Sequence, residues 1–128
     1  KKIKNKKIVS LGVTFKANTD DMRDSISLKM IPYVTKKGGI VTYYDPTGEK
    51  KEFIKNKKCK YVSNISKACL KADLIILHTE WDEFKSLDFK RLVKKNNFAV
   101  FDLRNLYNFD EMLKKNIKYY SIGRPSIK

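Results

Sequence analysis

The sequence is poor in the residues that usually build metal and redox sites. It holds two cysteines, one histidine, one tryptophan and five glycines in 128 residues, and no G-x-G-x-x-G spacing. Cys59 and Cys69 form no C-x-x-C pair and have no histidine at metal-ligand spacing, which argues against zinc. We expect two reduced thiols instead of a disulfide, with Cys69 in the core and a pKa of Cys59 lowered by nearby lysines. The pattern predicts no catalytic residue and no metal ligand.

Long apolar runs are also missing. No run approaches the ~20 residues of a membrane-spanning helix, and no signal peptide precedes the first strand-like segment. The composition, 41% hydrophobic and 12% aromatic, is that of a folded domain, which we expect to be cytoplasmic. Because the chain opens on a lysine-rich segment without Met, we expect residues 1–6 to be a linker remnant of a longer protein. Residues 7–128 then form one domain.

Acidic residues are scarce beside basic ones, 14 against 29, so the formal net charge is +15. A basic surface attracts the phosphates of nucleic acids. The lysines, however, are scattered along the chain, and only four cations are arginines. That scatter favours solvated surface lysines. A basic nucleic-acid-binding module remains the alternative from another functional class, and we expect no specific nucleic-acid partner.

Strand-like and helix-like segments alternate along the chain. The apolar run Leu74-Ile75-Ile76-Leu77 is typical of a strand covered on both faces. Ser25 is a plausible helix N-cap, and Pro32 should kink or shorten the helix that follows. We expect strands over 7–13, 40–44, 61–62, 74–78, 98–101 and 119–122, and later helices over 65–71, 88–94 and 110–115. This alternation predicts an α/β fold, a Rossmann-like three-layer sandwich with a mostly parallel sheet of about five to six strands.

Polar motifs follow most of the predicted strands. They include Phe15-Lys16, Asp45-Pro46, Thr79-Glu80-Trp81, Asp102-Leu103-Arg104-Asn105 and Gly123-Arg124-Pro125. Because the carboxyl ends of parallel strands share one edge of a sheet, we expect these groups to converge into a binding edge.

The first strand-to-helix loop is rich in charge and has a single glycine, Gly12. Lys16 and Arg104 suit phosphate oxygens and could bracket a pyrophosphate. In the alternative interpretation, each cation forms an ion pair with an acid of the chain, Lys16 with Asp20 and Arg104 with Asp102. Both readings stay open from the residues alone.

The acidic residues of that loop also have two possible roles. Asp20, Asp21 and Asp24 could hold a metal ion, but capping of the next helix and orientation of Arg23 are favoured. Trp81 could stack on a base or anchor a short helix. His78 ends an apolar strand, where a buried, hydrogen-bonded side chain is favoured over a general base.

Several motifs resemble the C-terminal domain of the UDP-glucose 6-dehydrogenase family. They stand in the same order at residues 12–23, 44–46, 72–84, 102–107 and 120–125, and cover nearly the whole chain. Members of that family use two NAD molecules to oxidise the C6 alcohol of a UDP-sugar, through thioester chemistry on a cysteine.

The resemblance implies that this chain is the UDP-binding domain alone. NAD would be bound mainly by a domain absent from the chain, and the nucleophilic cysteine would also lie elsewhere, so the isolated chain should be inactive. The implied partners are UDP-glucose or UDP-glucuronate and the N-terminal NAD-binding and central domains of the same enzyme. The resemblance further implies a homodimer or higher oligomer, a bacterial source and a role in polysaccharide biosynthesis.

Site roles carry over by motif position. The resemblance implies that Phe15, Lys16 and Arg104 contact the UDP-sugar and that Arg23 reaches NAD on the neighbouring domain. Many members have glycine where this chain has Leu103. Dehydrogenases of UDP-N-acetylmannosamine or GDP-mannose are the nearest alternatives; Glu80-Trp81 followed by Phe84 favours UDP-glucose.

Overall fold

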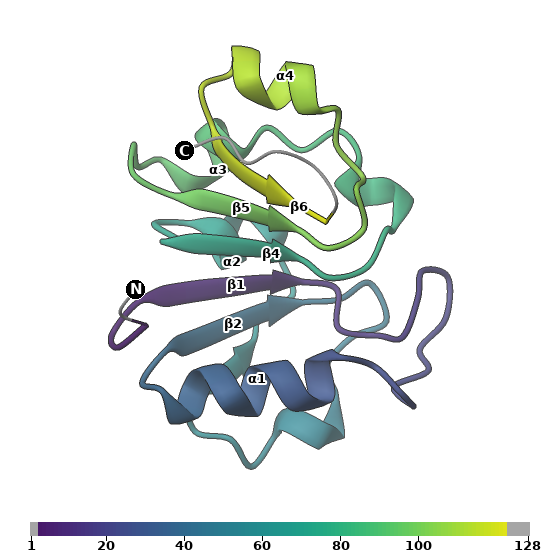
Figure 1. The fold of residues 1–128 in the computed structure, drawn as a ribbon. Coiled ribbons are helices and arrows are strands. Elements are labelled where there is room, and N and C mark those ends of the chain that lie inside the picture. Colours follow the sequence, from purple (N-terminus) through teal and green to yellow (C-terminus); the bar gives the residue numbers. More distant parts are fainter. Residues whose placement is uncertain (1–2, 123–128) are drawn as a thin grey trace.

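The computed structural model describes residues 3–122, and within them six strands form a single sheet (Figure 1). The strand order is β3-β2-β1-β4-β5-β6, and every pairing is parallel. The strands are β1 (Lys7–Leu11), β2 (Ile40–Tyr44), β3 (Cys59–Tyr61), β4 (Leu74–Leu77), β5 (Ala99–Asp102) and β6 (Lys118–Ser121). The predicted Rossmann-like fold is therefore confirmed.

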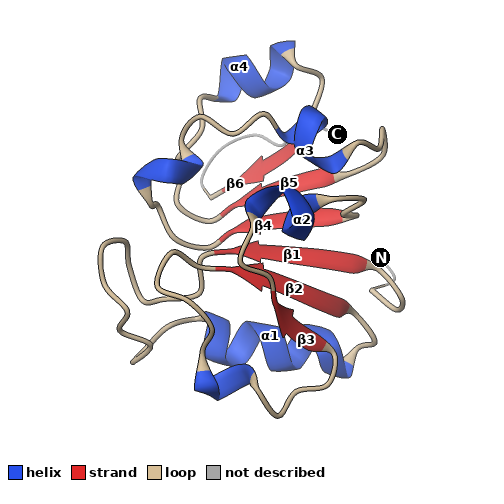
Figure 2. Ribbon diagram, turned by 180° about the vertical axis from the view of Figure 1, so that it is seen from behind, coloured by secondary structure: helices blue, strands red, loops and turns tan. Residues whose placement is uncertain are grey.

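Helices cover the sheet on both faces. The helices are α1 (Ser27–Lys36), α2 (Ile65–Cys69), α3 (Phe89–Val93) and α4 (Phe109–Lys114), with short 3-10 turns η1 (Lys51–Phe53) and η2 (Asp82–Phe84). α1 lies over β1 and β2 on one face, and α2 and α3 lie on the other (Figures 1 and 2). No helix within residues 3–122 is long and apolar enough to cross a membrane.

Side chains of successive strand residues point to opposite faces, which gives the domain two apolar cores. In β4, Ile75 and Leu77 join the core beneath α2 and α3, whereas Ile76 joins the core beneath α1. Cys69 and Cys59 belong to these two cores respectively and are both free thiols, as the sequence predicted.

The first helix differs from its prediction in two ways. Its N-cap position is Ile26, one residue later than the predicted Ser25, although the Ser25 hydroxyl, which donates to the Val13 carbonyl, also accepts from the Ser27 N–H at 3.3 Å. Pro32 lies inside α1, which nevertheless runs as one helix of ten residues. The proline ring faces solvent, and the missing N–H removes a single bond of the helical ladder.

Candidate functional site

The loop between β1 and α1, residues 12–26, leaves the carboxyl edge of the sheet through a tight turn. Gly12 has φ of +81°, and a Cβ built there would lie 1.6 Å from Oγ1 of Thr79 at the end of β4. The Val13 N–H donates to Oδ2 of Asp45, which follows β2, at 2.9 Å. Neighbouring strands on both sides therefore fix the start of the loop.

The far end of the loop returns to the same point. The hydroxyls of Ser25 and Ser27 each donate to the Val13 carbonyl at 2.6 Å, and both serines are buried. Met22 is buried in the core beneath α1, which anchors the middle of the loop. Both ends and one central residue are thus fixed, while the tip projects from the sheet (Figure 1).

Phe15 and Lys16 lie at this tip. Phe15 is 45% exposed, and its N–H donates to the Asp21 carbonyl at 2.9 Å. Lys16 is exposed, and its ammonium makes no hydrogen bond or ion pair with another residue of the described range 3–122. Its expected alternative partner, Asp20, is therefore not bound to it.

Arg104 joins two loops of the carboxyl edge. Its Nε donates to the His78 carbonyl at 3.0 Å, and its Nη2 donates to the Phe15 carbonyl at 2.7 Å. The alternative pairing with Asp102 involves only the Arg104 backbone N–H, which donates to Oδ1 at 3.0 Å. The guanidinium is instead 3.9 Å from Oε1 of Glu80.

These side chains surround one open hollow of about 620 Å³, which we call the Lys16–Arg104 hollow. It is lined by Phe15, Lys16, Ala17, Asn18, Glu80, Asp82, Lys85 and Arg104. The structure thus brings together the three predicted substrate-binding residues, Phe15, Lys16 and Arg104. It also adds Glu80, which the sequence placed in a motif without a role.

Arg23 lies apart from this hollow. It borders a second depression, shared with Asp20–Met22 and residues 49–52. Two hydrogen bonds of 3.0 Å join its guanidinium to Asp21, and they hold the pKa of that carboxyl down to about 2. Asp21 therefore orients Arg23, as expected. The expectation that the loop aspartates cap the next helix is wrong, because the first turn of α1 contains no acid.

Two buried carboxylates that the sequence left without a site role hold the turns of this edge. Asp45 accepts from Val13 and from the backbone and hydroxyl of Thr47. Asp102 accepts from the backbones of Arg104 and Tyr107 and from the Tyr119 hydroxyl, and is fully buried. Asp45 follows β2 and Asp102 is the last residue of β5, so their position at the strand ends was the only sequence signal of this role.

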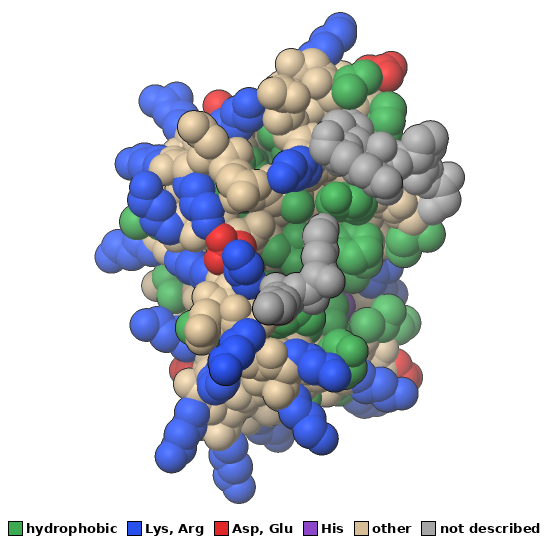
Figure 3. Space-filling model, turned by 60° about the vertical axis from the view of Figure 1, so that its left-hand side comes forward, with side chains coloured by type: hydrophobic (Ala, Val, Ile, Leu, Met, Phe, Trp, Pro, Cys, Tyr) green, Lys and Arg blue, Asp and Glu red, His purple; other side chains and the backbone are tan. Residues whose placement is uncertain are grey.

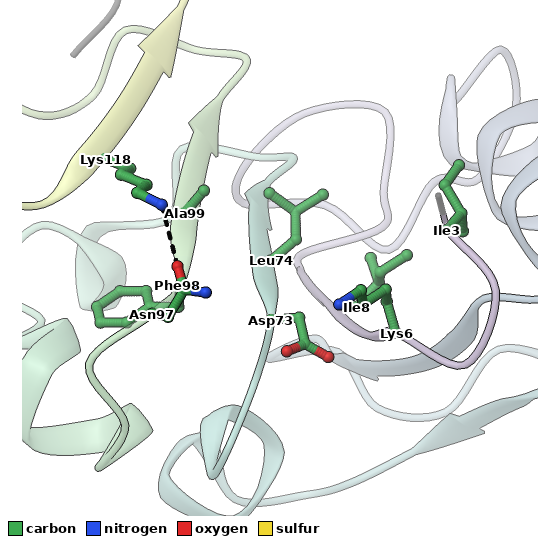
Figure 4. Close-up of a pocket in the computed structure, with 9 residues that line it drawn as sticks. All are labelled: Ile3, Lys6, Ile8, Asp73, Leu74, Asn97, Phe98, Ala99 and Lys118. Carbon is green, nitrogen blue, oxygen red and sulfur yellow. Dashed lines mark hydrogen bonds between the residues drawn. The ribbon is translucent and has the colours of Figure 1, made fainter. Parts of the chain in front are cut away.

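Another hollow lies at the opposite, amino-terminal end of the strands (Figure 4). It measures about 440 Å³ and is lined mainly by apolar side chains, among them Ile8, Leu74 and Phe98. Its main polar contact is a 3.0 Å bond from Lys118 to Asn97. Ligands of open α/β sheets bind at the carboxyl ends of strands, where the convergent cations of this domain also lie. We therefore assign the candidate site to the Lys16–Arg104 hollow.

A family comparison agrees with this geometry. The profile of the UDP-glucose/GDP-mannose dehydrogenase family, UDP binding domain, matches residues 9–109. The chain belongs to this family.

Its relatives are much longer. UDP-glucose 6-dehydrogenase of Rhizobium meliloti (strain 1021) is 42% identical over 127 residues, which are 96% of this chain and 28% of that protein. UDP-glucose 6-dehydrogenase TuaD of Bacillus subtilis (strain 168) is 32% identical over 130 residues, 98% of this chain and 28% of that protein. The chain thus spans little more than a quarter of the length of these relatives.

Solved structures share the fold. An NDP-N-acetyl-D-galactosaminuronic acid dehydrogenase from Methanosarcina mazei Go1 superposes with a TM-score of 0.82 at 26% identity, over 97% of this chain and 26% of that one. A UDP-glucose dehydrogenase from Pyrobaculum islandicum superposes with a TM-score of 0.65 at 24% identity, over 78% of this chain and 22% of that one.

Within the described residues of this UDP-binding domain, both cysteines and the single histidine are buried. Burial raises the pKa of both Cys59 and Cys69 to about 12, so the predicted lowering for Cys59 is wrong. Burial, and secondarily Arg104, lowers the pKa of His78 to about 4. His78 is buried as expected, but its Nδ1 has no hydrogen-bond partner in the described range, contrary to the expected bond. Trp81 packs against the core beneath α2 and α3 and directly precedes η2, which favours the anchoring role.

The described part of the domain also holds no group of three or more His, Cys, Asp or Glu side chains arranged to bind a metal ion. The motif at Gly123-Arg124-Pro125 lies outside the described residues.

Proposed function

We propose that this domain binds the UDP part of a nucleotide sugar in the Lys16–Arg104 hollow. The enzyme that carries it would be an NAD-dependent UDP-glucose 6-dehydrogenase, which oxidises UDP-glucose to UDP-glucuronate in two hydride transfers. Support comes from the family and from relatives named UDP-glucose 6-dehydrogenase.

One observation carries the proposal. An ammonium with no hydrogen bond or ion pair to residues 3–122 and a guanidinium held by two backbone carbonyls line the same open hollow at the carboxyl edge. Lys16 supplies a mobile point charge, whereas Arg104 supplies a rigid planar donor, and the two together suit a diphosphate. The exposed Phe15 ring beside them offers an apolar surface to a base or sugar face.

The role of this domain in the reaction is positioning. Lys16 and Arg104 would hold the diphosphate, so that the sugar extends toward the catalytic cysteine of another domain. Oxidation in such a cleft depends on orientation and on exclusion of water, and the projecting β1–α1 loop would close one side.

NAD is the hydride acceptor in this scheme, and its main site would lie outside this chain. The β1–α1 turn has one glycine, whose Cβ position is filled by Thr79, so a pyrophosphate cannot approach the turn as it does in glycine-rich loops. The residues present do not fit an independent dinucleotide site. Arg23, exposed and oriented by Asp21, would reach the NAD from the side.

Other nucleotide sugars are the second candidate, because structural neighbours include a UDP-N-acetylmannosamine dehydrogenase and a GDP-mannose dehydrogenase. Comparison of turnover of UDP-glucose, UDP-N-acetylmannosamine and GDP-mannose by the complete enzyme distinguishes them. We expect UDP-glucose to be the preferred substrate and the enzyme to act as a homodimer or higher oligomer.

Titration of UDP by calorimetry tests the site. In the enzyme that contains this domain, we expect Lys16→Ala and Arg104→Ala each to weaken UDP binding by about tenfold or more. Unchanged affinity in both variants would refute the site. The 128-residue chain alone should bind UDP weakly and reduce no NAD with UDP-glucose. Measurable NADH formation would overturn the proposal that catalysis depends on other domains of the enzyme.

A further inference from the structure

An acidic side chain lies directly beside the two cations of the Lys16–Arg104 hollow. Oε1 of Glu80 is 3.9 Å from Nε of Arg104, beyond hydrogen-bond distance, and the Glu80 side chain is 46% exposed. Glu80 therefore forms only a long, solvent-exposed ion pair with the arginine, without a hydrogen bond, and its carboxylate still lines the ligand space. A carboxylate in this hollow repels anionic ligands and so works against the two cations.

The second acid of the hollow has a partner. Asp82 pairs with Lys85 at 2.9 Å, and both side chains extend into solvent. Their charges largely cancel, and exposed pairs of this kind have little effect on nearby groups. The net charge that a ligand meets in the hollow is therefore set by Lys16, Arg104 and Glu80.

Arg104 cannot close on Glu80 to form a short, hydrogen-bonded pair that would neutralise the carboxylate more fully. Its Nε and Nη2 are fixed by the carbonyls of His78 and Phe15, which come from two different loops. Glu80 follows His78 by two residues on the loop that leaves β4, so the same bond that fixes Arg104 also fixes the backbone near Glu80. The acid and the guanidinium thus stay close whether or not a ligand is present.

We propose that Glu80 sets the charge that the hollow accepts, so that the domain binds a diphosphate ester in preference to a free nucleoside diphosphate. The inference rests on the proposed function, because it assumes that UDP ligands enter this hollow. A terminal phosphate loses its second proton near pH 6, so UDP at pH 8 carries about one negative charge more than a UDP-sugar. That extra charge is on the terminal phosphate, the group that the sugar replaces, and Glu80 repels it.

The test compares three ligands at pH 8 by NMR titration of the 128-residue chain. UDP has the free terminal phosphate, UDP-glucose has the ester and the sugar hydroxyls, and P2-methyl UDP has the ester without the sugar. We expect Glu80→Gln to strengthen UDP binding by about three- to tenfold more than it changes the binding of either ester, because it removes one nearby charge in a partly aqueous site. Asp82→Asn is the matched control, since it removes a paired charge from the same hollow, and it should leave these ratios unchanged.

Three results would overturn the inference: equal changes for all three ligands in Glu80→Gln, a change confined to UDP-glucose, or the same shift in Asp82→Asn. Failure of the proposed function looks different. In that case the unaltered chain shows no shifts near Lys16 and Arg104 with any of the three ligands.

Discussion

The base and the tip of the β1–α1 loop differ in almost every physical respect. At the base, Gly12, Val13, Ser25 and Ser27 are buried and tied to one another or to β2 and β4. At the tip, Phe15 and Lys16 are exposed. The comparison teaches that one short segment separates stability from binding: substitutions at the base should unfold the domain, and those at the tip should change its ligands.

The largest effect should follow Gly12→Ala. The new Cβ would overlap Oγ1 of Thr79, and the positive φ adds strain, so we expect a loss of about 4 kcal/mol in the free energy of unfolding. Urea denaturation measures it. Gly48→Ala is the control, because Gly48 also has positive φ, of +93°, but a Cβ there meets open space. Gly48→Ala should cost only about 1 kcal/mol. Equal losses in the two variants would show that backbone strain, and not packing against the end of β4, sets the stability of the loop base.

The next effect depends on pH. His78 has a pKa of about 4 in the folded domain, against about 6.5 when unfolded. The unfolded chain therefore binds a proton first, and stability should fall as pH drops from about 6.5 to 4, by about 3 kcal/mol in total. Thermal unfolding of the unaltered chain and of His78→Gln across this range measures the effect. A slope that persists in the variant would assign it to another group.

Arg104→Ala should combine the effects of base and tip. It removes the two bonds that join the loops after β1 and β4, and also a phosphate donor. We expect a loss of about 1–2 kcal/mol in stability together with weaker UDP binding. Lys16→Ala should weaken binding alone, because its ammonium has no partner in the described residues. Loss of stability in Lys16→Ala would break the comparison.

The smallest effect on UDP should come from Arg23→Ala. Arg23 borders a different depression from Lys16 and is paired with Asp21, so UDP affinity should change by less than about twofold. In the complete enzyme the same substitution should raise the KM for NAD. A change in UDP affinity without a change in the KM for NAD would instead assign Arg23 to substrate binding.

Lysine-rich surface offers a further contrast with the hollow. On the face shown in Figure 3, Lys and Arg side chains are spread over several elements and form no single groove. Any binding to duplex DNA should therefore be lost steeply as salt rises, whereas micromolar binding above physiological salt would support a nucleic-acid function.

How much of this could be predicted from sequence depends on whether the signal is local. The apolar run of β4 and the polar residues after most strands are local patterns, and they predicted the sheet, its carboxyl edge and the position of Phe15, Lys16 and Arg104 at that edge. The base of the loop depends on contacts between distant segments. Nothing near Ser25 in the sequence shows that its hydroxyl turns to Val13.

Residue environments were predicted less well for the same reason. The lysines next to Cys59 suggested a reactive thiol, but β3 buries it against α1 and burial dominates its pKa. Arg104 was expected to meet either a phosphate or Asp102. Its side-chain hydrogen bonds instead go to two backbone carbonyls, which carry no sequence signature.

The central claim is that UDP binds at the carboxyl edge, in the Lys16–Arg104 hollow. Amide chemical shifts of the 128-residue chain during a UDP titration test it most directly. We expect shifts concentrated at residues 14–18, 78–82 and 103–105, and none at the amino-terminal hollow around Leu74 and Lys118. Shifts centred on that opposite hollow, or no shifts at all, would contradict it.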